Sequence, residues 1–109
     1  MAQLIERMDK MNLYLISQDV NNDYDTFDSA VVAAESEGDA RTISPCGFVT
    51  HVADGHWMGT YPGGRDKGKA YKRSGISWVS YSDIGNVTVK YLGVTKLERG
   101  LVLSSFNAG

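Results

Sequence analysis

The chain has 109 residues, of which 42% are hydrophobic and 22% charged, and its formal net charge is −2. These values predict one globular domain with one core, and they exclude a disordered chain. The small net charge gives no reason to expect strong binding to DNA. It also disfavours a mimic of nucleic acid, which would be strongly acidic.

The single cysteine, Cys46, excludes an intrachain disulfide and a cysteine-rich zinc site, which fits a reducing compartment. No apolar run approaches the roughly 18 residues of a membrane helix. Residues 1–10 lack the apolar region of a secretory signal. We therefore expect a cytoplasmic protein with no membrane partner.

The first ten residues also lack the apolar density of a core element. We expect residues 1–10 to be an N-terminal extension and residues 11–109 to form a single α+β domain. Residues 12–18 form a nearly all-apolar run, which predicts a central strand. Residues 19–28 predict a loop, because Asn and Asp side chains hydrogen-bond the nearby backbone. Residues 29–35 predict a second buried strand.

A short helix is predicted after the second strand. Ser36 precedes Asp39 by three residues, which is the spacing of a capping box, with Asp in place of the usual Glu or Gln. We expect the helix to continue through Ile43, because Pro45 and Gly47 follow and end it.

The second half of the chain predicts short strands separated by turns. Asp54 and Gly55 form a hairpin signal. Residues 62–75 hold four glycines and five basic residues, which predicts a long exposed loop. Residues 82–84 predict a single turn, and residues 93–100 a longer one. The strands expected in this half cover residues 48–52, 56–61, 77–81, 87–92 and 101–106. The fold class is therefore α+β, a mainly antiparallel sheet of about six strands with one short helix.

The strongest candidate for a binding site is the basic loop, residues 63–73. It carries five positive charges against one negative from Arg65 to Arg73, and its glycines would let backbone N–H groups approach a phosphate. Tyr71 could stack a base. The loop lacks the Gly-Lys-Ser/Thr sequence of a Walker loop, and a solvated hairpin tip is the alternative interpretation. The residues expected to bind ligand here are Arg65, Lys67, Gly68, Lys69, Tyr71, Lys72 and Arg73.

The stretch from Asp19 to Asp39 holds seven acidic residues and no basic one. An EF-hand frame that starts at Asp19 puts Tyr24 where glycine belongs and Ala30 where the bidentate Glu belongs, so we expect no metal site. A structural turn is the alternative to a metal site. Two functional uses also remain open: the stretch contributes to the ligand site, or it pairs with the basic loop of a neighbouring copy in a homo-oligomer. The ligand-site residues expected here are Asn21, Asn22, Asp23 and Tyr24.

A third cluster, Cys46, His51, Asp54 and His56, could ligate zinc or form a Cys–His nucleophile. Cys46 lies where the predicted helix ends, and no orienting partner is evident, so we expect no catalytic residue and no cofactor. The two histidines flank the predicted hairpin and could simply be cross-strand neighbours. The aromatic residues of the strands are interpreted as packing residues rather than a ligand-stacking face; they are Trp57, Tyr61, Trp78 and Tyr81.

Four segments resemble a family of small proteins that bacteriophages and prophages encode: residues 13–18 (LYLISQ), 21–32 (NNDYDTFDSAVV), 57–61 (WMGTY) and 105–109 (SFNAG). The resemblance extends over about residues 11–109. The resemblance implies that the chain is encoded by a phage or prophage, and it implies no specific biochemical activity. Such accessory proteins often inhibit host defence, either as anti-CRISPR proteins that block an effector or as sponges that sequester cyclic nucleotide signals.

We therefore expect a phage-encoded, non-enzymatic protein of the host cytoplasm that sequesters a small anionic ligand of the cyclic nucleotide type, with the basic loop as a lid. The alternative is a protein–protein inhibitor of a host defence effector. A small nucleotide-processing enzyme ranks third, because no acid–base pair is evident.

We also expect a homo-oligomer. The segments 13–16, 30–34 and 101–106 are apolar enough to be buried on both faces of the sheet. One short helix cannot cover a face of about six strands. Either the sheet closes into a barrel, or a second copy packs against it, and we favour the second copy.

Overall fold

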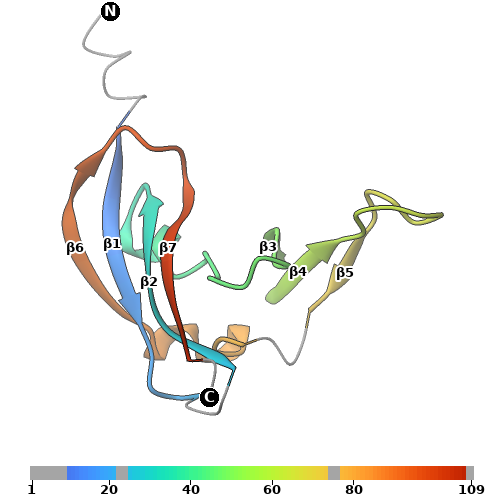
Figure 1. Ribbon diagram of the computed structural model, residues 1–109, viewed down its shortest axis with the longest axis horizontal. Helices are drawn as coiled ribbons and strands as arrows, with labels where there is room; N and C mark the ends of the chain where they lie inside the picture. Colours follow the sequence, from blue (N-terminus) through green and yellow to red (C-terminus); the bar gives the residue numbers. More distant parts are fainter. Residues whose placement is uncertain (1–9, 22–24, 74–76, 108–109) are drawn as a thin grey trace, which may run out of the picture.

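The computed structural model describes residues 10–21, 25–73 and 77–107. This part of the chain contains seven strands in two antiparallel sheets, one short α-helix and one 3-10 helix (Figure 1). The predicted fold class, α+β with a mainly antiparallel sheet, is confirmed. The expected N-terminal extension lies outside the described residues, apart from Lys10.

The larger sheet has four strands in the order β6-β1-β2-β7. They are β1 (Met11–Ser17), β2 (Thr26–Ala34), β6 (Thr88–Thr95) and β7 (Gly100–Asn107). The predicted central strand is confirmed, because β1 pairs with β2 on one side and β6 on the other. β6 and β7 follow each other in the chain but form the two opposite edges of this sheet (Figure 1).

The smaller sheet has three strands in the order β3-β4-β5: β3 (His51–Ala53), β4 (His56–Thr60) and β5 (Ala70–Lys72). The predicted hairpin turn is confirmed. Asp54 and Gly55 join β3 to β4 with φ angles of 52° and 73°, the left-handed pair that a two-residue turn of type I′ requires.

Several boundaries differ from the predictions because pairing partners decide them. β2 begins at Thr26, inside the predicted loop 19–28, because residues 26 and 27 pair with the end of β7. β5 lies inside the predicted loop 62–75, because β4 offers it an open edge. β6 continues to Thr95, because β1 pairs with it that far.

The helices follow the predictions in part. α2 (Glu37–Ala40) begins as predicted, since the Ser36 hydroxyl accepts a hydrogen bond from the Asp39 backbone N–H at 3.1 Å. It ends before Ile43, because the N–H groups of Thr42 and Ile43 donate to carbonyls three residues back and tighten the chain into turns. The strand predicted over residues 77–81 does not form, because residues 77–80 lie in no helix or strand. The single turn predicted at residues 82–84 lies inside a longer 3-10 helix, η1 (Tyr81–Asn86).

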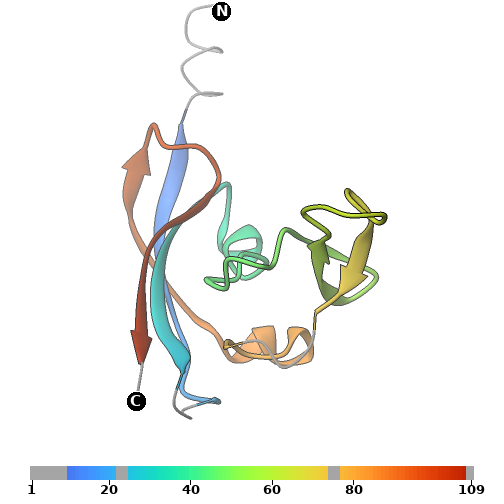
Figure 2. The same cartoon turned by 45° about the vertical axis from the view of Figure 1, so that its right-hand side comes forward.

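The core lies on one face of the four-stranded sheet, here called the inner face. Tyr14, Ile16 and Val32 of this face are buried, and they pack in one cluster with Trp57 and Trp78. Figure 2 shows that the two helices and the three-stranded sheet all lie on this side. The cover thus comes from other segments of the same chain, so the inner face does not need the barrel or the second copy that we expected.

The last strand departs from the predicted burial. Ala30 and Val32 to Ala34 are buried in β2, whereas Leu101, Val102, Leu103 and Phe106 of β7 are exposed in the single chain. No helix in the described part of the chain is long and apolar enough to cross a membrane.

Candidate functional site

The tip of the basic loop is a solvated turn. It connects β4 to β5, and its backbone closes on itself, because Gly68 N–H donates to the Tyr61 carbonyl at 2.9 Å and Tyr61 N–H donates to the Lys69 carbonyl at 3.0 Å. Arg65 and Lys67 are exposed, and Lys69 forms an exposed ion pair with Asp66 at 3.3 Å. The tip points away from the four-stranded sheet (Figure 1).

Tyr71, expected to stack a base, is already packed. Its ring centroid lies 4.6 Å from that of Tyr61. A Cβ atom on Gly59 would lie 2.6 Å from its Cζ atom, so the ring rests directly on the Gly59 backbone. Lys72, on the same strand, is exposed. These contacts explain why residue 59 is a glycine and leave the Tyr71 ring with a structural role.

Arg73 differs from the rest of the basic loop. It follows β5, and its backbone N–H donates to the Trp57 carbonyl at 2.8 Å. Its guanidinium carbon lies 5.1 Å from the centroid of the Phe48 ring, a cation–π contact. Its Nε atom is buried and has no hydrogen-bond partner among the described residues. The Arg73 side chain therefore packs against the protein, unlike the exposed side chains at the tip of the loop.

A cavity of about 490 Å³, here called the Trp78 cavity, lies between the β3–β4 turn and η1. It brings together two of the residues predicted for the ligand site, Asn21 and Arg73, from the acidic and the basic stretch. The other predicted residues of the acidic stretch, 22–24, lie outside the described residues. The lining residues are Val20, Asn21, Gly55, His56, Trp57, Arg73, Trp78, Val79, Ser80, Tyr81, Ser82 and Asp83.

Two tryptophans of this cavity differ in their hydrogen bonds. Both are buried. The Nε1–H of Trp57 donates to the Val79 carbonyl at 2.9 Å. The Nε1–H of Trp78 is buried and has no partner in the described part of the chain. Buried N–H groups nearly always have a hydrogen-bond partner. Two residues that line this cavity, Trp78 and Arg73, each have a buried N–H without one among the described residues.

Asn21 and Asp83, two other polar residues of the cavity, form hydrogen bonds within the protein. Asn21 Nδ2 donates to the Trp78 carbonyl at 3.4 Å. Asp83 accepts a hydrogen bond from the Ser80 hydroxyl at 3.0 Å, so part of its acceptor capacity is used. His56 is exposed at the rim of the cavity, and no contact joins it to Asp83 within the described residues.

Gln18 is a positioning residue that the sequence analysis missed. Its side chain is buried, accepts from the Asn21 backbone N–H at 2.8 Å, and donates to the carbonyls of Asn21 and Phe27, each at 2.8 Å. It therefore holds the start of the acidic loop against β2. A single Gln at the end of an apolar strand gives no signal of this role, because the partners depend on the fold.

The histidines and the cysteine do not form one site. His51 pairs with Met58, and His56 pairs with Ala53, so the two histidines are not cross-strand partners. Cys46 and His51 line a second cavity of about 590 Å³, here called the Cys46 cavity, whereas His56 lines the Trp78 cavity. Among residues 10–21, 25–73 and 77–107, no group of three or more His, Cys, Asp or Glu side chains could hold a metal ion.

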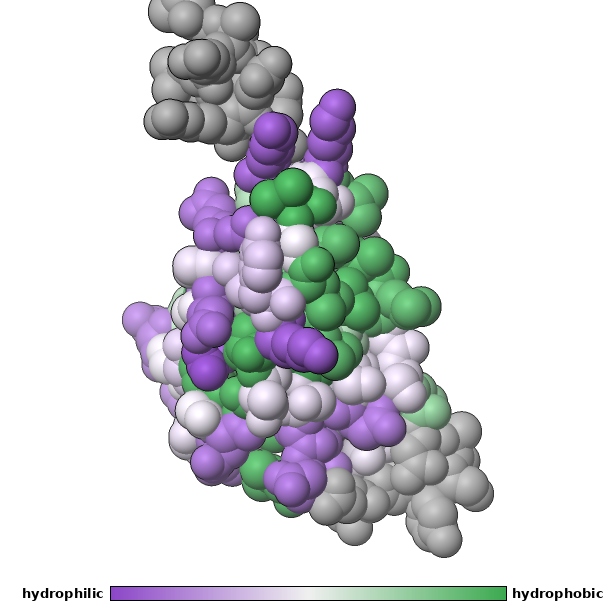
Figure 3. Space-filling model, turned by 90° about the vertical axis from the view of Figure 1, so that its left-hand side faces the viewer, coloured by the Kyte–Doolittle hydropathy of each residue, from purple (hydrophilic) through white to green (hydrophobic). Residues whose placement is uncertain are grey.

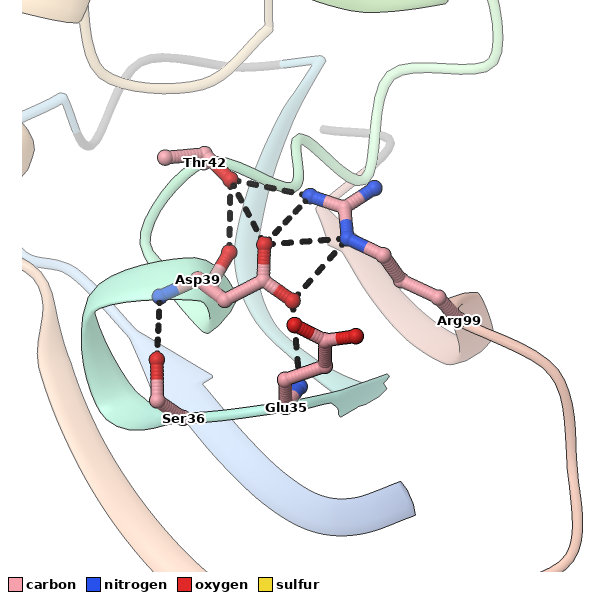
Figure 4. A network of polar contacts seen from close by, with 5 residues as sticks. All are labelled: Glu35, Ser36, Asp39, Thr42 and Arg99. Carbon is pink, nitrogen blue, oxygen red and sulfur yellow. Dashed lines mark hydrogen bonds and ion pairs between the residues drawn. The ribbon is translucent and has the colours of Figure 1, made fainter. Parts of the chain in front are cut away.

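An ion pair between Asp39 and Arg99 joins α2 to the start of β7 (Figure 4). Arg99 Nη2 lies 2.8 Å from Asp39 Oδ1 and donates to the Thr42 hydroxyl at 2.9 Å. Partial burial alone would raise the pKa of Asp39. The hydrogen bonds from Arg99 and the Glu35 backbone N–H, with the charge of Arg99, outweigh burial and hold this pKa below its ordinary value. The network is therefore interpreted as structural, since it joins α2 to the residue that precedes β7.

The chain matches no family model, no curated protein and no solved structure. The likeness to phage-encoded proteins therefore stays a prediction.

Proposed function

We propose that this protein is a non-catalytic binding protein that holds a small anionic ligand, of the phosphate-bearing nucleotide type, in the Trp78 cavity. The observation that carries the proposal is the buried Nε1–H of Trp78, which has no partner among the described residues. Trp78 lines the same cavity as Arg73, whose Nε–H is also buried and without a partner in the described part of the chain. Both groups are donors only, and a ligand with acceptor oxygens supplies what they lack.

The energetics favour a polar occupant. A buried donor without a partner costs about 1–3 kcal/mol, and two of them beside one cavity are a large fraction of the stability of a small domain. The volume of about 490 Å³ lies within the range of small-molecule sites. A bound acceptor turns this cost into binding free energy, because the free protein carries the penalty and the complex does not.

The charges favour an anion over a cation. Arg73 carries a permanent positive charge beside the cavity. The carboxylate that lines it, Asp83, already accepts from Ser80. Arginine is the preferred residue for phosphate and carboxylate groups, since its planar guanidinium offers several donors at once.

Binding without catalysis is supported by the arrangement of His56 and Asp83. They are the imidazole and the carboxylate of this cavity, and no hydrogen bond joins them within the described residues. A hydroxyl nucleophile is commonly activated by an adjacent general base, and no such hydrogen-bonded pair joins the imidazole and the carboxylate here. In a phage setting, which rests on the sequence resemblance, such a protein would sequester a nucleotide signal of host defence.

Calorimetry with inorganic phosphate, cyclic dinucleotides and molecules of the cyclic ADP-ribose type tests the proposal. The informative variant is Arg73→Gln, and Arg65→Gln is its matched control at the solvated loop tip. We expect the wild type and Arg65→Gln to bind one of the nucleotides equally, and Arg73→Gln to bind it at least about tenfold more weakly, since charged hydrogen bonds contribute about 1.5–3 kcal/mol. Loss of binding in Arg65→Gln alone would place the site in the loop tip and refute the proposal.

A further inference from the structure

β7 is an edge strand that carries no charge. Residues Gly100–Asn107 include neither a charged residue nor a proline. Four of their apolar side chains are exposed, among them Leu103 at 66% and Phe106 at 47%. Proteins usually protect such an edge with charges or proline, because its free N–H and C=O groups pair with other strands. The opposite edge strand, β6, carries Lys90.

The apolar surface of β7 continues across the outer face of the four-stranded sheet. Side chains alternate between the two faces, so Leu13 and Leu15 lie opposite to the buried Tyr14 and Ile16. Leu103 is paired with Val31 of β2. Figure 3 shows hydrophobic residues gathered in one patch on the molecular surface on this side.

We propose that β7 pairs antiparallel with β7 of a second copy of this chain, on a two-fold axis through Ser104, to form a continuous eight-stranded sheet. A second copy fits this edge because an antiparallel pair of identical strands is self-complementary. The two-fold axis then closes the assembly as a dimer, since each β7 edge is used once.

The bulge in β7 decides which residues oppose each other once the axis is placed at Ser104. Val31 pairs with Leu103 and Val32 with Leu101, so Val102 is an extra residue, and the side-chain alternation shifts there. Opposed residues of an antiparallel pair share a face of the sheet. With the axis at Ser104, Leu103 opposes Ser105 of the second copy on the outer face. Past the bulge, Leu101 opposes Phe106 of the second copy on the inner face.

The Cys46 cavity supports this register. It has a volume of about 590 Å³, and Gly100 and Leu101 of β7 form part of its wall. The exposed ring of Phe106 from the second copy lies opposite Leu101 in the proposed pair, at the rim of this cavity. An aromatic side chain that enters a pocket is the usual anchor of a protein interface. Two such anchors, related by the axis, supplement the backbone hydrogen bonds of a strand about 27 Å long, at about 3.4 Å for each residue.

The dimer is independent of the proposed ligand site, because no residue of β7 lines the Trp78 cavity. Sedimentation velocity across micromolar concentrations tests it with two matched variants. Leu103→Lys places a charge on β7, and Val94→Lys places one on β6 at a residue that is 63% exposed. We expect dimers for the wild type and for Val94→Lys, and monomers for Leu103→Lys with an unchanged circular dichroism spectrum. A monomeric wild type, or equal dissociation by both variants, would overturn the proposal.

A disulfide cross-link tests the register. In a Cys46→Ala background, which removes the single native thiol, Ser104→Cys brings two thiols together on the axis. Directly opposed Cα atoms lie about 4.5–5.5 Å apart, within the range that a disulfide spans. We expect Ser104→Cys to form a covalent dimer under mild oxidation, and the control Ser105→Cys to remain uncross-linked. Preferential cross-linking of Ser105→Cys would refute the axis at Ser104.

Discussion

The two buried tryptophans allow the missing hydrogen bond of Trp78 to be measured as a free energy. Trp57 and Trp78 are 2% and 1% exposed, so Phe at either residue removes the same side-chain volume from the core. Much of the packing cost therefore cancels in the difference between the two variants. What remains is the hydrogen bond, which Trp57 makes to the Val79 carbonyl and Trp78 lacks.

The two substitutions act in opposite directions on the hydrogen-bond term. Trp57→Phe leaves the Val79 carbonyl without its indole donor, which costs about 1–3 kcal/mol when the group is buried. Trp78→Phe removes a buried donor that has no partner and so relieves a penalty of similar size. We expect Trp57→Phe to be less stable than Trp78→Phe by at least about 1 kcal/mol.

Urea unfolding, followed by far-ultraviolet circular dichroism because each variant loses a fluorophore, gives the two free energies of unfolding. Equal values, or a lower value for Trp78→Phe, would mean that the Trp78 N–H is satisfied in the free protein, and the missing hydrogen bond would be ruled out. Titration of both variants with the ligand found by calorimetry adds a second comparison. We expect Trp78→Phe to bind it more weakly than the wild type.

The remaining predictions concern packing, pH and the position of the acidic loop. Gly59→Ala forces the Tyr71 ring away from the β4 backbone, and we expect a loss of about 1–3 kcal/mol in thermal unfolding, with no loss for Gly63→Ala, where an added Cβ meets no atom within 4 Å. The pKa of Asp39 is lower in the folded protein than in the unfolded one, so its stabilisation is complete above the unfolded value of about 3.9 and is lost as the pH falls through the folded value. Acid titration of Asp39→Asn is therefore expected to show a shallower loss of stability below about pH 4 than the wild type, and an identical slope would contradict the role of this ion pair. Gln18→Ala removes three hydrogen bonds, two of them to the Asn21 backbone, and we expect weaker ligand binding together with a lower melting temperature.

Much of the four-stranded sheet could be predicted, because its signals are local. Two apolar runs were predicted to be buried strands, and both form central strands of this sheet. They are the runs at residues 12–18 and 29–35. The Ser36 cap and the Asp54–Gly55 turn were also correct, since each depends on residues within one turn of the chain. The pairing order could not be predicted, because β6 and β7 lie at opposite edges although they are consecutive.

The less regular half of the molecule depends on long-range contacts. Residues 77–81 were predicted to form a strand because Trp78 and Val79 are apolar. Trp78 and Val79 are buried in the core, but no strand pairs with them in the described part of the chain. The strand β5 could not be predicted, because it lies in a stretch that is rich in glycine and lysine. Its pairing comes from the free edge of β4, which no pattern within residues 70–72 can indicate.

The candidate site could be predicted only in part. Asn21 and Arg73 were chosen for their side-chain chemistry, and the fold brings both to the Trp78 cavity. The tip residues Arg65, Lys67 and Lys69 were chosen for charge alone, and they lie in solvent. Trp78 was interpreted as a packing residue, which its burial supports. Its unpartnered N–H could not be foreseen, because hydrogen-bond partners depend on the tertiary structure.

The most direct test of the proposed ligand site is a nitrogen–proton correlation spectrum of the two indole N–H groups. The chain has two tryptophans, so Trp78→Phe assigns both signals. On titration with the nucleotide that calorimetry selects, we expect a downfield shift and slower solvent exchange for the Trp78 signal, because its N–H gains an acceptor. We expect little change for Trp57, which already donates to the Val79 carbonyl. Binding that leaves the Trp78 signal unmoved would show that the ligand does not accept a hydrogen bond from Trp78, and the proposed site would be wrong.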